Sequence, residues 1–120
     1  MRFIFWLNLK GIKPVQEFID KQSPRDIRKI KRKFKNVADF TLGELYRAGD
    51  VDDFKECRKK YGFALYEFIA FEFRFFFVMI DEDIAIACHA FRKKGQKTPP
   101  QEINKAIRTA MEVRNKYQLK

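Results

Sequence analysis

The feature that most constrains the fold is the run of apolar residues 75–80, which carries no polar side chain on either face. Successive residues of a strand point to opposite faces of its sheet, so a strand of this kind needs cover on both sides. Strand-like composition extends over residues 65–70, 73–80 and 84–91, and the acidic residues 81–83 fit a short hairpin loop. These segments predict a mainly antiparallel sheet with the apolar run as a central strand.

Helix signals precede this strand region. Pro14 can open a short helix with one apolar face, and Ser23 followed by Pro24 is a good start for a second helix. Apolar residues then recur every three or four positions as far as Leu45, which predicts one amphipathic helix that ends near Gly49.

A C-terminal helix follows the strand region. Residues 98–101 resemble a capping box with Thr98 at the cap, and an apolar face recurs from Ile103 to Met111. Residues 2–9 and 54–60 are interpreted as two further strands, the second of them at a sheet edge. The chain is therefore predicted to be α+β, with a sheet of four or five strands, two N-terminal helices and one C-terminal helix.

Composition limits the class of protein. At 120 residues the chain should form one domain, residues 1–120, and its 14 Phe residues and Trp6 should form a dense core. Two separated cysteines favour neither a disulfide scaffold nor a zinc site, and no apolar run could span a membrane. We expect a cytoplasmic protein without a metal ion or another cofactor. The net charge of +10 favours a polyanionic partner.

Positive charge is concentrated in two places. Four of the six residues 92–97 are cationic, and they connect the last strand to the last helix, where a sheet could hold them against a phosphate. The outward face of the helix that begins at Pro24 carries a second group, which is either a solvated face or a contact surface for a polyanion. Its members are Arg28, Lys29, Lys31, Arg32, Lys33 and Lys35.

Three segments resemble the RelE/HigB-like toxins of bacterial type II toxin–antitoxin modules, with the phage-derived branch as the best match. The run from Phe91 to Pro99 carries the most specific part of the resemblance. The segments are Leu65-Tyr66-Glu67, Phe73-Arg74-Phe75-Phe76-Phe77 and His89-Ala90-Phe91-Arg92-Lys93-Lys94-Gly95-Gln96-Lys97-Thr98-Pro99. Two positions depart from the family pattern: Ile69 replaces a frequent basic residue, and residues 70–72 lack the usual Gly-rich or polar turn.

The resemblance implies a metal-independent endoribonuclease that cuts messenger RNA, often on the ribosome, and that a helix-turn-helix antitoxin neutralises. In this reaction the 2′-hydroxyl attacks the adjacent phosphodiester, giving a 2′,3′-cyclic phosphate and a 5′-hydroxyl. The chemistry needs a base, a cation that stabilises the developing charge, and a proton donor for the leaving oxygen. The ribosome and messenger RNA, the antitoxin and a possible second copy of the chain are thus the expected partners.

Four residues are the catalytic candidates. Arg74, a charge inside an apolar strand, matches the family's strand arginine and would stabilise the transition state, unless it only pairs with Glu67 or Glu72. Lys93 and Lys94 match the family's paired lysines; one would transfer a proton and the other would bind phosphate, unless both are solvated. His89 is the remaining candidate, although a structural histidine is the favoured interpretation.

Six further residues are candidates for RNA binding or for orienting the site. Glu67 could orient Arg74 through a bidentate pair or form a purely structural ion pair. Tyr117 could stack on a base, although solvated side chains are favoured for the helix residues. The full set is Glu67, Arg92, Lys97, Arg108, Arg114 and Tyr117.

Two other functions stay open. The chain could be a non-catalytic module of the same fold that binds nucleic acid or a protein, and one related toxin branch inhibits DNA gyrase. A membrane-surface role is the weakest alternative, because the apolar face of the cationic helix is needed for the core.

Overall fold

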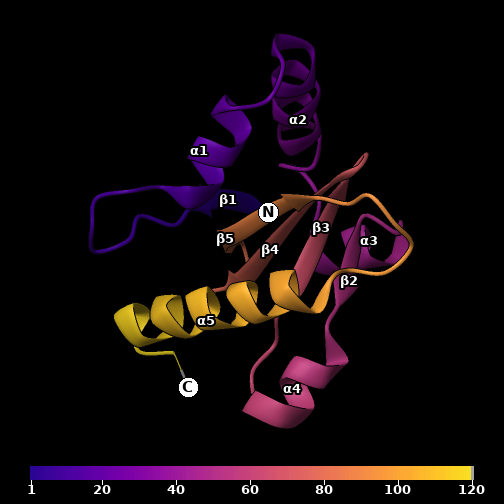
Figure 1. Cartoon of the computed structure of the whole chain (residues 1–120). Coiled ribbons are helices and arrows are strands. Elements are labelled where there is room, and N and C mark those ends of the chain that lie inside the picture. Colours follow the sequence, from indigo (N-terminus) through magenta and orange to yellow (C-terminus); the bar gives the residue numbers. More distant parts are fainter. Residues whose placement is uncertain (120) are drawn as a thin grey trace.

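The computed structural model describes residues 1–119, which form five strands and five helices (Figure 1). Lys120, which the predicted domain includes, lies outside the described residues. In chain order the elements are β1 (Arg2–Phe5), α1 (Pro14–Asp20), α2 (Pro24–Asn36), α3 (Leu42–Arg47), β2 (Val51–Asp53), α4 (Lys55–Tyr61), β3 (Tyr66–Ala70), β4 (Phe73–Met79), β5 (Ile84–Arg92) and α5 (Pro100–Tyr117).

The strands form one sheet in the order β1-β5-β4-β3-β2. β1 runs parallel to β5, whereas the pairs β5–β4, β4–β3 and β3–β2 are antiparallel. The prediction of an α+β fold with a mainly antiparallel sheet is confirmed. The apolar run lies in β4 at the centre of the sheet, as its pattern predicted.

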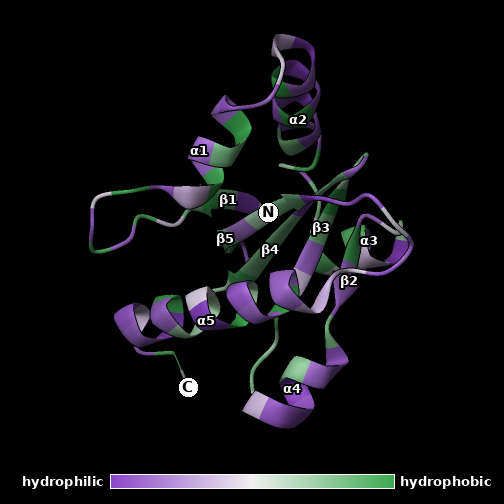
Figure 2. Ribbon diagram, in the orientation of Figure 1, coloured by the Kyte–Doolittle hydropathy of each residue, from purple (hydrophilic) through white to green (hydrophobic). Residues whose placement is uncertain are grey.

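Helices cover both faces of the sheet. Phe73, Phe75 and Phe77 of β4 belong to one core, which we call the α2-side core because it includes Ile19 of α1 and Ile30 of α2. The intervening side chains of β4 belong to the α5-side core, formed with α4 and α5, whose buried members include Cys57, Phe76, Val78, Cys88, Ala106 and Ile107. In Figure 2 the hydrophobic colour accordingly gathers on the strands.

Aromatic rings dominate the α2-side core. The ring centroid of Phe34 lies 4.9 Å from that of Phe3 and 5.0 Å from those of Phe68 and Phe75. Edge-to-face and tilted contacts of this kind stabilise a core beyond the area that they bury. The prediction of a Phe-rich core is confirmed for these residues, and Trp6 is buried in the α5-side core. The prediction is wrong for Phe71, which is exposed in the β3–β4 turn.

The prediction of an edge strand at residues 54–60 is wrong, because residues 55–61 form helix α4. Phe54 and Cys57 both pack in the α5-side core, and a spacing of three brings side chains to one face of a helix. Gly62 ends α4 with a φ of 76°, which only glycine adopts without strain. The edge strand is the short β2, in which Val51 pairs with Phe68 of β3.

The long helix predicted from Pro24 to Leu45 consists of two helices. Ser23 caps α2 as predicted, by accepting a hydrogen bond of 3.1 Å from the backbone N–H of Asp26. α2 ends at Asn36, and Thr41 starts α3 through a capping box with Glu44. The apolar spacing continues across the break because both helices pack on the same core, so the spacing alone could not reveal it.

The first strand is shorter than predicted. β1 ends at Phe5, and residues 6–13 form a loop that leads to α1. None of the helices within residues 1–119 combines the length and the apolarity needed to cross a membrane.

Candidate active site

Strand register brings several polar candidates to the face of the sheet that α5 covers. Ile69 of β3 pairs with Arg74 of β4, and Arg74 pairs with Phe91 of β5. Phe91 belongs to the α5-side core, so Arg74 points toward this face. Glu67 lies two residues before Ile69 on the same strand and therefore shares the face.

Glu67 is the centre of this group. It is only 3% exposed, its Oε1 lies 3.7 Å from Nε of Arg74, and its Oε2 accepts a hydrogen bond of 3.4 Å from Oγ1 of Thr98. Burial raises the pKa of the Glu67 carboxyl above its ordinary value, and the positive charges of Arg74 and Lys93 oppose this shift. A buried carboxyl with a raised pKa beside two cations is a candidate for proton transfer.

Thr98 corrects one prediction made from the sequence. The N-cap of α5 is Pro99 and has no side-chain cap, so the predicted capping box with Thr98 is wrong. The Thr98 hydroxyl instead reaches across to Glu67 on β3, 31 residues earlier in the chain. No local sequence signal distinguishes these two roles, because the competing acceptor is a tertiary neighbour.

Arg74 is held by the backbone as well as by Glu67. Its Nη1 donates hydrogen bonds to the carbonyl oxygens of Phe71 and Phe73, and its side chain is only 14% exposed. Among the described residues, its Nε has no hydrogen-bond partner and meets Glu67 only at 3.7 Å. The contact with Glu67 is therefore not the bidentate pair that was one interpretation of the sequence.

The loop of residues 93–98, which we call the lysine loop, leaves β5 beside the β3–β4 turn. The backbone N–H of Lys93 donates a hydrogen bond of 2.7 Å to the carbonyl oxygen of Glu72. Lys93 and Lys97 line an open cleft of about 600 Å³ together with Glu67 and Thr98. Lys94 is exposed and does not line this cleft.

Three further acidic side chains line the cleft, together with Lys55 and next to Glu67, which pairs with Asp52. They are Asp52 and Asp53 of β2 and Glu56 of α4, and we call these residues the acidic wall. The Asp53 carboxylate accepts a hydrogen bond of 3.0 Å from Nη2 of Arg58. A phosphate would consequently bind on the side of the lysine loop. The sequence signal for the acidic wall was the acidic run that includes Asp52 and Asp53, whose position in the same cleft as the lysines only the fold reveals.

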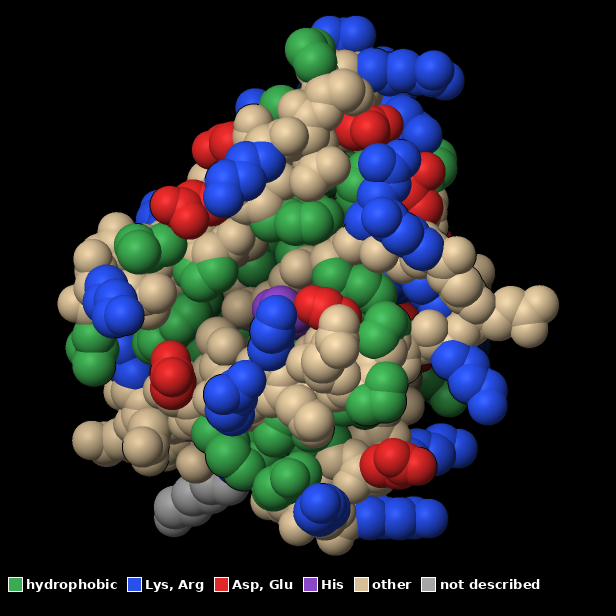
Figure 3. Space-filling model, viewed as in Figure 1, with side chains coloured by type: hydrophobic (Ala, Val, Ile, Leu, Met, Phe, Trp, Pro, Cys, Tyr) green, Lys and Arg blue, Asp and Glu red, His purple; other side chains and the backbone are tan. Residues whose placement is uncertain are grey.

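Basic side chains are prominent on the surface around this region. Figure 3 shows lysine and arginine side chains projecting along the right-hand margin of the molecule, where the β5–α5 loop lies in Figure 1. Acidic side chains interrupt this positive surface, so its charge pattern is mixed. The mixture restricts where a polyanion can approach the cleft.

His89 faces α5 because of a β-bulge. Phe76 pairs with His89 but Phe77 pairs with Ala87, so the register shifts by one residue at this point. His89 Nε2 lies 3.3 Å from Oε1 of Glu102 in α5, and burial lowers the pKa of His89 while Glu102 opposes this shift. His89 lies outside the cleft lining, so the geometry favours the structural interpretation.

The remaining candidates do not converge on the cleft. Arg92 follows Phe91 and points to the other face, where its Nη2 lies 3.5 Å from Oε2 of Glu72 and its guanidinium lies over the Phe73 ring. Arg114 packs its guanidinium 4.6 Å from the centroid of Phe63. Tyr117 is 43% exposed near the end of α5, and a helix rise of about 1.5 Å per residue puts it some 20 Å along the axis from the cleft end. Arg108 is exposed on the same helix.

Within the described residues 1–119, no group of three or more His, Cys, Asp or Glu side chains could hold a metal ion. The cleft is lined by the buried carboxyl of Glu67, by the hydroxyl groups of Thr98 and Tyr46, by the acidic wall and by several lysines. Groups of this kind can bind an oxyanion and transfer a proton.

The fold and the cleft together define a small basic α+β protein with a lysine-lined cleft at the edge of its sheet. Residues 17–110 match the sequence model of a family described as phage-derived Gp49-like proteins (DUF891). The chain belongs to this family, which is associated with toxin–antitoxin systems. A search of curated proteins finds no significant match to the chain.

Proposed function

We propose that this protein is the toxin of a type II toxin–antitoxin module of the RelE/HigB-like kind and that it cleaves messenger RNA without a metal ion. Membership of the phage-derived family supports the toxin assignment. The observation that carries the nuclease assignment is the buried carboxyl of Glu67, with its raised pKa, in one cleft with Lys93 and Lys97.

The proposed reaction uses the groups that line the cleft. The Glu67 carboxylate accepts the proton of the 2′-hydroxyl, and the 2′-oxygen bonds to phosphorus. The bond from phosphorus to the 5′-oxygen then breaks, and the Lys93 ammonium donates a proton to this leaving oxygen. The products are a 2′,3′-cyclic phosphate and a 5′-hydroxyl.

The other cations have supporting roles in this proposal. Lys97 binds the phosphate oxygens, and Lys94, exposed beside it, guides the substrate toward the cleft. Arg74 positions the Glu67 carboxylate, and its charge stabilises the negative charge that develops on the phosphate. His89 supports α5 through Glu102 and takes no part in the reaction.

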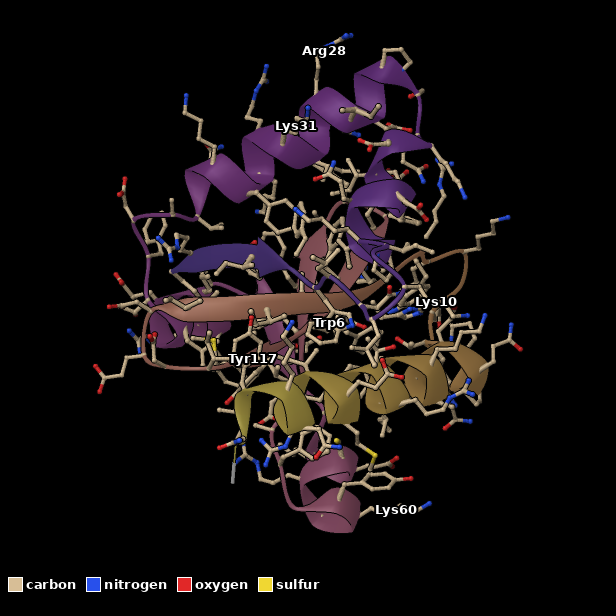
Figure 4. All side chains as sticks on the ribbon, turned by 90° about the vertical axis from the view of Figure 1, so that its left-hand side faces the viewer. Trp6, Lys10, Arg28, Lys31, Lys60 and Tyr117 are labelled. Atoms are coloured by element: carbon tan, nitrogen blue, oxygen red, sulfur yellow. The ribbon has the colours of Figure 1, made fainter. Side chains whose placement is uncertain are left out.

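The proposed partners are translated messenger RNA on the ribosome and a helix-turn-helix antitoxin. The cationic face of α2 supports a polyanionic or acidic partner, since Arg28 and Lys31 project from the helix away from the body of the molecule (Figure 4). An acidic antitoxin that covers this face and the lysine loop would block access to the cleft.

The acidic wall supports a second candidate function. Asp52, Asp53 and Glu56 repel a phosphate backbone, and the donors of Arg74 are partly occupied by carbonyl oxygens of the β3–β4 turn. A non-catalytic protein that binds nucleic acid or a protein partner through its basic surfaces would also have these features.

The decisive experiment compares two site variants with a matched control. Lys93→Ala and Glu67→Gln should relieve growth arrest and should lower RNA cleavage at least about 100-fold, the usual contribution of a general acid or base. Lys60→Ala removes the same charge near the C-terminal end of α4, outside the cleft lining, and should retain full activity (Figure 4). Cleavage is measured on RNA in a translating extract and on free RNA, with detection of the cyclic phosphate.

Three outcomes are informative. If both site variants keep full activity while thermal unfolding shows an intact fold, the assignment of the site is wrong. If the parent binds RNA in a salt-dependent manner but cleaves none at any concentration, the second candidate replaces the nuclease. Cleavage only in the translating extract would establish the requirement for the ribosome.

A further inference from the structure

The turn between β3 and β4 contains an unusual residue. Ala70 pairs with Phe73, so the turn consists only of Phe71 and Glu72. Phe71 has a φ of 62° and a side chain that is 54% exposed. A positive φ is unfavourable for a bulky side chain, and a two-residue hairpin turn usually places Gly, Asn or Asp at such a position.

Folding alone therefore does not explain the phenylalanine at this position. The ring contributes little to either core, and glycine would satisfy the backbone conformation better. Among the described residues, Gln118 is the other non-glycine residue with a positive φ, and it is a polar residue at a helix end. Residues with an unfavourable backbone conformation are concentrated at functional sites, where the function requires a residue that destabilises the fold locally.

The surroundings of Phe71 are cationic. Nζ of Lys29 on α2 lies 4.3 Å from the centroid of the Phe71 ring, and Arg74 donates a hydrogen bond to the Phe71 carbonyl oxygen. The next residue, Glu72, accepts the backbone hydrogen bond of Lys93. The turn thus lies between the cationic face of α2 and the lysine loop.

We infer that Phe71 is a stacking platform for one base of a single-stranded RNA that enters the cleft. The phosphates on either side of this base would be bound by Lys29 on α2 and by the lysine loop. This inference rests on the proposed function for the identity of the substrate. It adds a positioning residue at the β3–β4 turn.

The chemistry of the turn favours RNA over an apolar partner. An exposed aromatic ring flanked by cations is the combination that binds single strands, because the base stacks on the ring while the cations neutralise its phosphates. Glu72 is the acidic group beside the ring, and its carboxylate lies 3.5 Å from the guanidinium of Arg92, which offsets its charge. An apolar protein anchor would need an apolar rim, whereas the ring lies against the Lys29 ammonium.

Phe71→Gly and Phe71→Trp test this inference in opposite directions. Phe71→Gly should weaken binding of a fluorescein-labelled single-stranded RNA of mixed sequence roughly tenfold, the order of effect seen when a stacking side chain is removed. Phe71→Trp should keep the parent affinity, and its added fluorescence should be quenched when this RNA binds. Binding is measured by fluorescence anisotropy on the full chain.

Two controls separate stacking from folding and from charge. The thermal unfolding midpoint of Phe71→Gly should equal or exceed that of the parent, because glycine accommodates the positive φ. An abasic RNA of the same length keeps the phosphates but lacks the bases, so the parent and Phe71→Gly should bind it equally.

The inference is overturned if Phe71→Gly binds the base-containing RNA as tightly as the parent, or if the parent does not bind it. The inference is also overturned if Phe71→Gly loses affinity equally for the base-containing and the abasic RNA, because the ring would then contribute to binding without stacking on a base. These outcomes differ from failure of the proposed function. RNA bound through Phe71 but never cleaved refutes the nuclease alone, whereas cleavage that is unaffected in Phe71→Gly refutes the platform alone.

Discussion

The two faces of the sheet are filled by different chemistry, and neighbouring residues of β3 display the contrast. Phe68 points into the α2-side core and is fully buried among other phenylalanine rings. Glu67 points to the α5 side and is also almost fully buried, but against Arg74, Thr98 and the lysine loop. The α2-side face therefore stabilises the fold through apolar burial. The α5-side face includes buried polar groups, which stabilise the fold less than apolar side chains would.

This difference indicates where function is located. The buried and partly buried members of the α2-side core are hydrophobic, and they extend across the sheet from β1 to β2. The α5 side has an apolar core at its centre and polar groups at the end nearest the lysine loop. Buried polar groups beside a cleft are functional candidates, because apolar side chains at the same positions would stabilise the folded state more.

The largest loss of stability should result from removing an aromatic ring from the α2-side core. Phe68→Ala removes a ring that contacts Phe3, Phe34 and Phe75, and it should lower the free energy of unfolding by about 3–5 kcal/mol. Chemical denaturation followed by circular dichroism measures this loss. Leu9→Ala is the control, because Leu9 is fully exposed and its truncation should change stability little. A similar loss for both variants would contradict the proposed role of this core.

A smaller, pH-dependent effect should come from the opposite side of the same strand. The folded-state pKa of Glu67 is raised, so the folded protein binds this proton more tightly than the unfolded chain does. Stability from this group is present at low pH and is lost as the pH rises above its ordinary value of 4.5. Glu67→Gln removes this loss, so the stability of the variant relative to the parent should improve between pH 4 and pH 7, as followed by urea unfolding at each pH. If the difference in stability between the variant and the parent did not change with pH, the positive charges beside Glu67 would fully offset the effect of burial on its pKa.

The smallest effect concerns the histidine beneath α5. The folded-state pKa of His89 is lowered, so the unfolded chain takes up this proton first as the pH falls. The stability that His89 contributes is present above its ordinary pKa of 6.5 and is lost as the pH falls below that value. His89→Gln should flatten this part of the pH profile of the thermal unfolding midpoint. RNA cleavage by the variant at neutral pH should remain close to that of the parent, and a large loss would restore His89 as a catalytic candidate.

The strands at the centre of the sheet were predictable from the sequence, because strands that are buried on both faces consist almost entirely of apolar residues. The predicted segments 65–70, 73–80 and 84–91 correspond to β3, β4 and β5, with ends that differ by one residue. The last helix was predictable for a related reason, since its apolar face recurs at helical spacing. Helix α4 was missed although Phe54 and Cys57 have the spacing of a helix face, because two apolar residues in so short a segment do not define a period.

The site was predictable only in part. Lys93 and Lys97 follow a strand in the sequence, so the order of residues along the chain is enough to predict a cationic connection there. The acidic wall of the same cleft was not predictable, because β2 reaches the cleft through its pairing with β3. Thr98 was assigned to a helix cap on local grounds, and a carboxyl from another strand competes for its hydroxyl.

The amino-acid sequence by itself determined the class of fold, the central position of β4 and the presence of a basic loop after β5, because these depend on local composition and periodicity. Tertiary structure alone decided which charges meet. The bulge in β5 directs His89 toward α5. The Arg74 guanidinium donates a hydrogen bond to a carbonyl oxygen of the β3–β4 turn, and strand pairing buries Glu67 beside the lysine loop. Burial and proximity between distant residues shift the pKa values of Glu67 and His89, and neither property is encoded by any short stretch of the chain.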